Sequence, residues 1–202
     1  KVARPSLGCI MLKPVRITAP ADTPISLAEA KANMRVDGTD EDALITSLIG
    51  AAVDLIDGWS GILGRCVFTQ TWRQDFQDFP SGRMIRLPLD PVQSVTVVYS
   101  DTANVEQTLS GTFYSLHTDD VGPFLWLLDG QNWPSVNDRL DAVRIEMVVG
   151  YGAASDVPNS IKQALFLMVG HWYENREASG RSMQEIPLGV YALLAPYRRI
   201  SI

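Results

Sequence analysis

The chain has 202 residues, of which 46% are hydrophobic and 20% are charged. This composition is typical of an ordinary globular domain and argues against a disordered chain or a fibrous repeat. The formal net charge of -6 at pH 7 argues against a general nucleic-acid coat, because duplex binding requires Lys and Arg to neutralise phosphates. No stretch reaches the roughly 20 apolar residues that span a bilayer.

The two cysteines, Cys9 and Cys66, lie far apart, and neither belongs to a CxxC pair. Because the chain has only two histidines, a zinc cluster is not expected. A disulfide between the two cysteines stays open, although it would be unusual in a reducing compartment. Residues 1–10 lack a long apolar segment and a secretory cleavage pattern, so we expect no signal peptide and a protein that works inside a cell. Met11 could itself be a start residue.

Charge is unevenly distributed near the N-terminus. Residues 1–20 carry four basic side chains and no acid, namely Lys1, Arg4, Lys13 and Arg16. Residues 21–60 carry eight acids against Lys31 and Arg35. Two interpretations stay open: a terminus beside a solvated helical face, or docking of the basic arm on the acidic region of a second copy.

Two helices are expected before residue 60. Ser26 and Glu29 have the S-x-x-E spacing of a capping box, which predicts a short helix that ends at Gly38. Thr39 or Asp40 is expected to cap a second helix over residues 40–59. Its apolar residues fall on one stripe at helical spacing: Leu44, Ile45, Leu48, Ile49, Ala52, Leu55, Ile56 and Trp59.

From about residue 65 the apolar period changes to two, which predicts strands. The first strand lies around Trp72, and the following ones are "RMIRLPL", "VQSVTVVYS", "VEQTL", "TFYSLH", "PFLWLLD" and "AVRIEMVVGYG". "DTAN" at 101–104 is expected to form a hairpin turn. Closely spaced strands with turn residues between them favour an antiparallel sheet or small sandwich.

Helical spacing returns after residue 152, with Ile161, Leu165, Met168 and Trp172 on one stripe. "VYALLA" predicts a last short helix, which Pro196 ends. The order predicts an α+β fold, in which a helical core, or helix bundle, holds an inserted antiparallel β block. The expected domains are an N-terminal arm (1–24), the helical core with a C-terminal tail (25–64 and 153–202) and the β domain (65–152).

The segment "HWYENREAS", residues 171–179, concentrates polar groups that could suggest an active site. A hydrolase would need a nucleophile and an orienting acid near His171. Ser179 lies beyond the expected helix end, and Glu174 at i+3 is an ordinary surface neighbour. No nucleophile elbow, metalloprotease helix, P-loop or dinucleotide fingerprint is present. We therefore interpret the segment as a polar helix end and expect no catalytic, metal-binding or cofactor-binding residue.

Two further groups of residues have a functional and a structural interpretation. The acids Asp37, Asp40, Glu41 and Asp42 lack the ligand spacing of a calcium loop, so helix capping and solvation are the favoured role. Trp126 and Trp133 could form a ligand platform, but buried aromatic side chains of the β block are the simpler interpretation.

Several segments together resemble the head–tail connector proteins of tailed phages, prophages and gene transfer agents. They are "SLAEAKANMRVDGTDEDALITSLIGAAVDLIDGWSG", "TQTW", "LPLDPVQSVTVVY" and "VPNSIKQALFLMVGHWYENREA", in that order. The resemblance covers most of residues 25–178 and leaves out residues 1–20 and the tail after Gly180. Its motif positions are Ser26, Leu27, Glu29, Ala30 and Lys31, then Pro88, Pro91, Val92 and Val95, then Tyr173, Glu174, Asn175, Arg176 and Glu177.

The resemblance implies a structural adaptor with a helical core and a β insertion, and no enzyme. It would form a ring beneath the portal, expected to be a dodecamer because the portal ring usually has that symmetry. Its partners would be copies of itself, the portal protein and a tail-side stopper or tail terminator protein, with DNA only passing through the channel and no membrane. It would reside in a virion or phage-like particle assembled in the bacterial cytoplasm. A small-molecule or peptide-binding module on the β block, or a hydrolase that uses His171, are the alternatives.

The resemblance also suggests where such a subunit makes its contacts. A C-terminal segment would dock on the portal through Tyr197, Arg198, Arg199 and Ile200. The alternative is a last helix that folds back on its own core through Val190, Leu193 and Leu194. Contacts between subunits are expected at Asp40, Glu41, Asp42 and Arg176.

Overall fold

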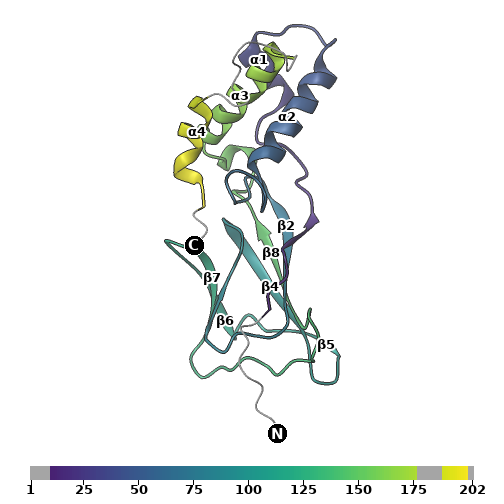
Figure 1. Ribbon diagram of the computed structural model, residues 1–202, viewed down its shortest axis with the longest axis vertical. Helices are drawn as coiled ribbons and strands as arrows, with labels where there is room; N and C mark the ends of the chain where they lie inside the picture. The colour runs from purple at the N-terminus through teal and green to yellow at the C-terminus, as the bar shows by residue number, and fades with distance from the viewer. Residues whose placement is uncertain (1–9, 177–187, 200–202) are drawn as a thin grey trace. The chain divides into compact units, whose positions relative to one another are not determined.

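The computed structural model describes residues 10–176 and 188–199. The chain divides into two compact units (Figure 1). Within the described residues, the helical unit comprises residues 20–69, 151–176 and 188–199, and the β unit comprises residues 10–19 and 70–150. The β unit therefore begins five residues after the predicted boundary at 65 and also takes in residues that the sequence assigns to an N-terminal arm.

The helical unit contains helices α1 (Leu27–Met34), α2 (Asp42–Ile56), α3 (Asn159–Glu174) and α4 (Leu188–Leu194), with 3-10 turns at Ala154–Asp156 and Ala195–Tyr197. The predicted capping box of α1 is confirmed. The Glu29 backbone N–H donates to Ser26 Oγ at 3.2 Å, and the Ser26 backbone N–H donates to Glu29 Oε2 at 2.7 Å. Both bonds satisfy donors that the first helical turn leaves without an intrahelical acceptor.

Helix α2 is shorter than the predicted range of 40–59 at both ends. Its N-cap is Glu41, without a side-chain cap, so the predicted caps at Thr39 or Asp40 are wrong. Here the Asp42 N–H donates to the Thr39 carbonyl in a preceding turn. At the other end the helix stops at Ile56, and Trp59 lies outside the stripe with 39% of its surface exposed. The chain turns there because Gly58 adopts φ 78°, which favours glycine.

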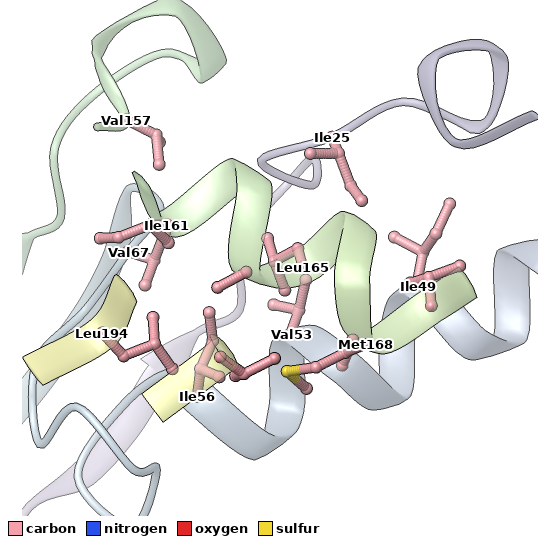
Figure 2. Close-up of a cluster of buried hydrophobic side chains, with 14 of the residues drawn as sticks. Ile25, Ile49, Val53, Ile56, Val67, Val157, Ile161, Leu165, Met168 and Leu194 are labelled. Atoms are coloured by element: carbon pink, nitrogen blue, oxygen red, sulfur yellow. The ribbon is translucent and has the colours of Figure 1, made fainter. Parts of the chain in front are cut away.

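The core of the helical unit lies between α2, α3 and α4 (Figure 2). Figure 2 shows Ile49, Val53 and Ile56 of α2 facing Ile161, Leu165 and Met168 of α3. The same cluster includes Leu194 of α4 and residues from the connecting segments, such as Ile25, Val67 and Val157. Burying one side chain of this size contributes about 1.5–3 kcal/mol, so three short helices become stable only by packing together.

The β unit has two antiparallel sheets. A five-stranded sheet has the order β1 (Val15–Thr18), β2 (Gln70–Phe76), β8 (Val143–Val149), β4 (Val92–Ser100) and β5 (Glu106–Thr108). A three-stranded sheet has the order β3 (Met84–Arg86), β7 (Gly122–Leu127) and β6 (Tyr114–Asp119). The predicted α+β class is confirmed, with helices and antiparallel strands in one chain.

The central strand β8 of the five-stranded sheet has one buried side and one polar side. Along β8, Ile145 and Met147 are fully buried, whereas Arg144 and Glu146 alternate with them. The Tyr114 hydroxyl of β6 donates to the Val95 carbonyl of β4 at 3.3 Å, which joins the two sheets. The turn predicted at 101–104 is also confirmed: Asn104 adopts φ 61°, and its N–H donates to the Asp101 carbonyl.

Candidate assembly surfaces

A cluster of three side chains joins the start of α2 to the end of α3. The Tyr173 hydroxyl and the Arg176 guanidinium both donate to the Glu41 carboxylate, and the Arg176 guanidinium lies 4.8 Å from the centre of the Tyr173 ring. These hydrogen bonds, first the one from Tyr173, hold the pKa of Glu41 below its ordinary value. The hydrogen bond to Glu41 is also the main reason that the pKa of Tyr173 is raised. Glu41 and Arg176, both expected at a contact between subunits, therefore pair within one chain.

The other two acids of this turn behave differently from each other. Asp42 forms an ion pair with Lys31 of α1 at 2.5 Å, which again lies within one chain. Asp40 is exposed. Among the residues that the structure describes, no group of three or more Asp, Glu, His or Cys side chains could hold a metal ion.

The C-terminal segment folds back onto the helical core. Val190 and Leu194 of α4 are buried, and Leu193 and Tyr197 pack against the same cluster. The Arg199 N–H donates to the Leu63 carbonyl at 2.8 Å. Of the four residues expected to dock on the portal, Tyr197 and Arg199 thus have contacts within the chain. Arg198 is exposed, and Ile200 lies outside the described residues.

Next to this segment, α3 and α4 leave apolar surface uncovered. Leu167 of α3 is 39% exposed and Tyr191 of α4 is 48% exposed. A Cβ atom on Gly189 would lie 3.8 Å from Leu167 Cδ1, so the two helices meet closely there. Leu167 and Tyr191 were not singled out from the sequence, because the stripe pattern of α3 predicts only its buried side.

His171 lies in the last turn of α3, as the sequence predicts. The helix ends at Glu174, and Asn175 Nδ2 donates to the His171 carbonyl at 2.8 Å and lies 3.3 Å from its Nδ1. Ser179 falls outside the described residues. The described part of the chain places His171 at the end of α3, with the Asn175 side chain as a neighbour.

The outer face of the three-stranded sheet carries an aromatic and cationic cluster, which we call the aromatic–arginine face and define as Met84, Arg83, Arg86, Phe124 and Trp126. The Arg83 guanidinium lies 5.2 Å from the Trp126 ring centre, and the Arg86 guanidinium lies 5.1 Å from that of Phe124. The Phe124 and Trp126 rings meet edge to face at 6.5 Å. Each arginine therefore covers part of an aromatic ring.

Each of these arginines also has a carboxylate partner. Arg83 pairs with Asp129 at 2.7 Å, and Arg86 donates to both oxygens of Asp119. Asp119 also accepts from the backbone N–H groups of Val121 and Gly122. The hydrogen bonds from Arg86 are the main reason that the pKa of Asp119 is lowered to about 2. The cluster is thus held in place from both ends of the β6–β7 hairpin.

Sequence reasoning placed the β-block tryptophans inside, and this is wrong for Trp126. The residue alternates with buried Leu125 and Leu127, so it points to the outer face, where 36% of its surface is exposed. Trp133 stacks on Phe79 at 4.8 Å between ring centres, and its Nε1 donates to the Gly82 carbonyl. The segment "PFLWLL" is apolar throughout, so the sequence carries no alternation that shows which side of the strand Trp126 faces.

A polar pocket borders this face, lined by Ser81, Gly82, Arg83, Leu127, Leu128, Gly130, Gln131, Asn132 and Trp133. Small-molecule sites are usually concave and mostly apolar, with a few placed polar groups. Loop backbone and amide side chains dominate this lining, which therefore gives little support to a small-molecule-binding module. No helix within the described residues is long and apolar enough to cross a membrane.

Comparison with known families decides the identity of the chain. The sequence model for head completion proteins matches residues 23–200. The chain belongs to the head completion protein family. The expected relationship to head–tail connectors is thereby confirmed, and the match extends through the tail after Gly180, which the sequence resemblance had left out.

Chains in solved structures of gene transfer agent (GTA) particles are similar to most of this chain. A chain in the neck of an empty GTA particle, computed with C6 symmetry, has a TM-score of 0.76 and 25% identity, covering 95% of this chain and 97% of that one. A chain in the virion of a native GTA particle has a TM-score of 0.74 and 26% identity, with the same coverage. A third, from a native GTA neck computed with C12 symmetry, shares the fold at 24% identity and a TM-score of 0.66. Comparison with curated proteins finds no match.

Proposed function

We propose that the chain is a subunit of a ring that lies beneath the portal of a phage-like particle. The ring joins the DNA-filled capsid to the tail and continues the DNA channel. One observation carries this proposal: a neck protein of a GTA particle matches 95% of this chain and is itself 97% covered. The head–tail connector role thus applies to the whole chain, both units included.

The same family membership favours a structural role over catalysis. A subunit that joins other proteins needs complementary surfaces and no reaction centre. His171 lies in the last turn of α3, where the Asn175 side-chain amide donates to the His171 carbonyl, an ordinary contact at a helix end. The hydrolase alternative has no further observation in its favour.

The partners that follow from the proposal are copies of the chain in a ring, the portal protein, and a tail-side stopper or tail terminator protein. A dodecamer is the stoichiometry that matches a portal ring. DNA would pass through the channel without sequence-specific contacts. The protein would be found in the particle after assembly in the bacterial cytoplasm.

Portal docking by the C-terminal segment remains a proposal, and the geometry narrows it. Tyr197 and Arg199 are engaged with the helical core, so Arg198 is the described residue of the four that extends into solvent. Exposed Leu167 and Tyr191 supply apolar surface on the same helices. Exposed apolar side chains with a cation nearby have the composition expected of an interface centre with a polar rim.

Contacts between subunits at Asp40, Glu41, Asp42 and Arg176 also remain a proposal. Glu41, Asp42 and Arg176 already pair within the chain, so in a ring they would hold the α2 start rigid rather than reach a neighbour. Asp40 is the exposed member that remains for a cation on the next subunit.

Deletion of the gene in the cell that makes the particle tests the proposal. We expect DNA-filled heads without tails by electron microscopy, and recovery of tailed particles with the wild-type gene on a plasmid. Complementation by His171→Ala should be equally complete, because no chemistry is lost. Particles with normal tails in the deletion strain would contradict the connector role.

A further inference from the structure

The aromatic–arginine face has the composition of an interface centre. Trp, Met and Arg are enriched at the centres of protein–protein interfaces relative to the rest of the surface, and Trp and Arg are frequent binding hot spots. Cation–π contacts and ion pairs already fix both arginines. Because these side chains are ordered before binding, association costs little additional side-chain entropy.

A second exposed apolar surface lies at the β1 edge of the five-stranded sheet. All four residues of β1 are exposed, with Val15 and Ile17 at 48% each. Met11, just before the strand, is 55% exposed. Exposed edge strands are normally covered or protected by charge and proline. Lys13, Pro14 and Arg16 disfavour the addition of another strand here, but they leave the apolar side chains available for docking.

We propose that strand β1 of one subunit docks on the aromatic–arginine face of the next subunit in the ring. This inference rests on the proposed ring-forming function. A ring with cyclic symmetry needs two different surfaces on every subunit, since each copy contacts one neighbour with each. The two surfaces belong to different sheets of the β unit, and Figure 1 shows β1 (purple) and the strands β6 and β7 on opposite sides of that unit.

Charge complementarity supports a second copy as the occupant. Residues 10–19 carry Lys13 and Arg16 and no acid. The aromatic–arginine face is bordered by Asp119, Asp120 and Asp129, which outnumber its two arginines by one. The Asp129 side chain is 97% exposed even while it pairs with Arg83, so it can also meet a cation from another subunit. Such pairs steer association and fix register more than they add affinity.

The acidic turn before α2 is the other candidate partner for this basic segment. Two of its acids, Glu41 and Asp42, have cationic partners within the chain, as Asp119 and Asp129 do at the aromatic–arginine face, so ion pairing alone does not separate the two candidates. Docking there would satisfy Lys13 and Arg16 but would leave the apolar side chains of β1 uncovered. The aromatic–arginine face offers carboxylates to Lys13 and Arg16 and apolar surface for the β1 side chains, so we favour it. Stable interfaces bury about 1,200–2,000 Å² in total, so β1 supplies only part of the ring contact.

Cysteine cross-linking within rings formed on the portal tests the inference. Ile17→Cys and Ser115→Cys are combined in one chain, with Cys9→Ser to remove a native thiol and Cys66 left in place because it is buried. Ser115 pairs with Trp126 across the sheet, so it shares the aromatic–arginine face. A short bismaleimide should then link successive subunits into a ladder of oligomers on a denaturing gel. Val15→Cys with His117→Cys repeats the test in case the first pair perturbs folding.

Two matched pairs act as controls in the same background. Ile17→Cys with Val105→Cys probes the β5 edge, and Ile17→Cys with Asp37→Cys probes the acidic turn, where Asp37 is also exposed; neither should give a ladder. Rings that form but cross-link only through a control pair, or through neither test pair, would overturn this inference and leave the connector role intact. Failure of the wild-type chain to form any ring on the portal would instead contradict the proposed function, and this inference with it.

Discussion

The Glu41 carboxylate accepts a hydrogen bond from the hydroxyl of Tyr173, a residue 132 positions further along the chain. This bond ties the N-cap of α2 to the last turn of α3, the two helices that flank residues 70–150 of the β unit in sequence. Arg176 adds an ion pair to the same carboxylate and covers the Tyr173 ring. The segment that first suggested an active site thus fixes the end of α3 to the start of α2.

This cluster should make stability depend on pH at both ends of the scale. Glu41 has a pKa below its ordinary 4.5, so its contribution is present above that pH and is lost as the pH falls through the folded-state pKa. Tyr173 has a pKa above its ordinary 10.0, so its contribution is present below that pH and is lost as the pH rises through the folded-state value. We expect the difference in Tm between wild type and Glu41→Gln to be largest near neutral pH.

Thermal unfolding of the two proteins from acid to alkaline pH measures this difference. Asp40→Asn is the matched control, because it removes a neighbouring exposed acid, and its Tm should stay close to the wild-type value. A Glu41→Gln difference that is constant across the whole range would count against the cluster.

Two glycine-to-alanine substitutions, one in the tight turn after α2 and one inside α2, should have opposite effects on stability. A Cβ atom on Gly61 would lie 2.3 Å from the Asp57 carbonyl oxygen, so Gly61→Ala forces the backbone to move and should cost about 1–3 kcal/mol. Gly50 lies inside α2 with no atom within 4 Å of an added Cβ, so Gly50→Ala should stabilise by up to about 1 kcal/mol. Urea unfolding gives both values; equal effects would show that the turn is not as constrained as its geometry indicates.

The local elements were largely predictable from sequence because their signals are local. The Ser26–Glu29 capping box, the buried positions Ile161, Leu165 and Met168, and the turn at 101–104 each depend on neighbouring residues and appear as predicted. The exposed position of Trp59 was missed, because helical periodicity cannot show where the helix stops. Gly58 was the available signal for that end.

The arrangement of strands could not be predicted in the same way. Pairing of β3 with β7 joins Ile85 to Leu125, and nothing in either segment specifies so distant a partner. Strand β1 was assigned to an arm, because four residues are too few to distinguish an edge strand from an extended terminus. The aromatic–arginine face depends on both pairings, since Arg86 and His117 meet Phe124 only when β3 and β6 flank β7.

Removal of the C-terminal segment should affect folding as well as docking. Truncation after Ala195 deletes Tyr197, which packs on the core, and the Arg199 N–H that donates to Leu63. We therefore expect a lower Tm, which makes truncation a poor test of portal binding. Unchanged Tm would show that these contacts contribute little in solution.

A charge reversal separates docking from folding. Arg198 is exposed, so Arg198→Glu should leave Tm within about 2 °C of wild type, since surface substitutions stay within about 0.5 kcal/mol. If Arg198 meets acidic residues at the rim of the portal interface, Arg198→Glu should lower the affinity for the portal about tenfold or more, as measured by co-purification. Arg198→Lys keeps the charge and serves as the control. Undiminished binding by Arg198→Glu would show that the chain docks on the portal through another surface.

His171→Ala should yield folded protein with normal particle assembly. Its ring packs at the end of α3 near Asn175, so loss of this side chain should cost no more than about 1 kcal/mol. Circular dichroism and complementation of the deletion strain measure the two properties. A hydrolytic activity of the purified protein that this substitution abolishes would overturn the structural interpretation.

The mass of the complex between this chain and the portal tests the central claim most directly. We expect native mass spectrometry of the co-expressed proteins to show one assembly, with as many copies of this chain as portal subunits, and a weakly associating species when the chain is alone. A chain that stays monomeric beside a fully assembled portal, at concentrations where both are abundant, would contradict its role as a ring-forming connector.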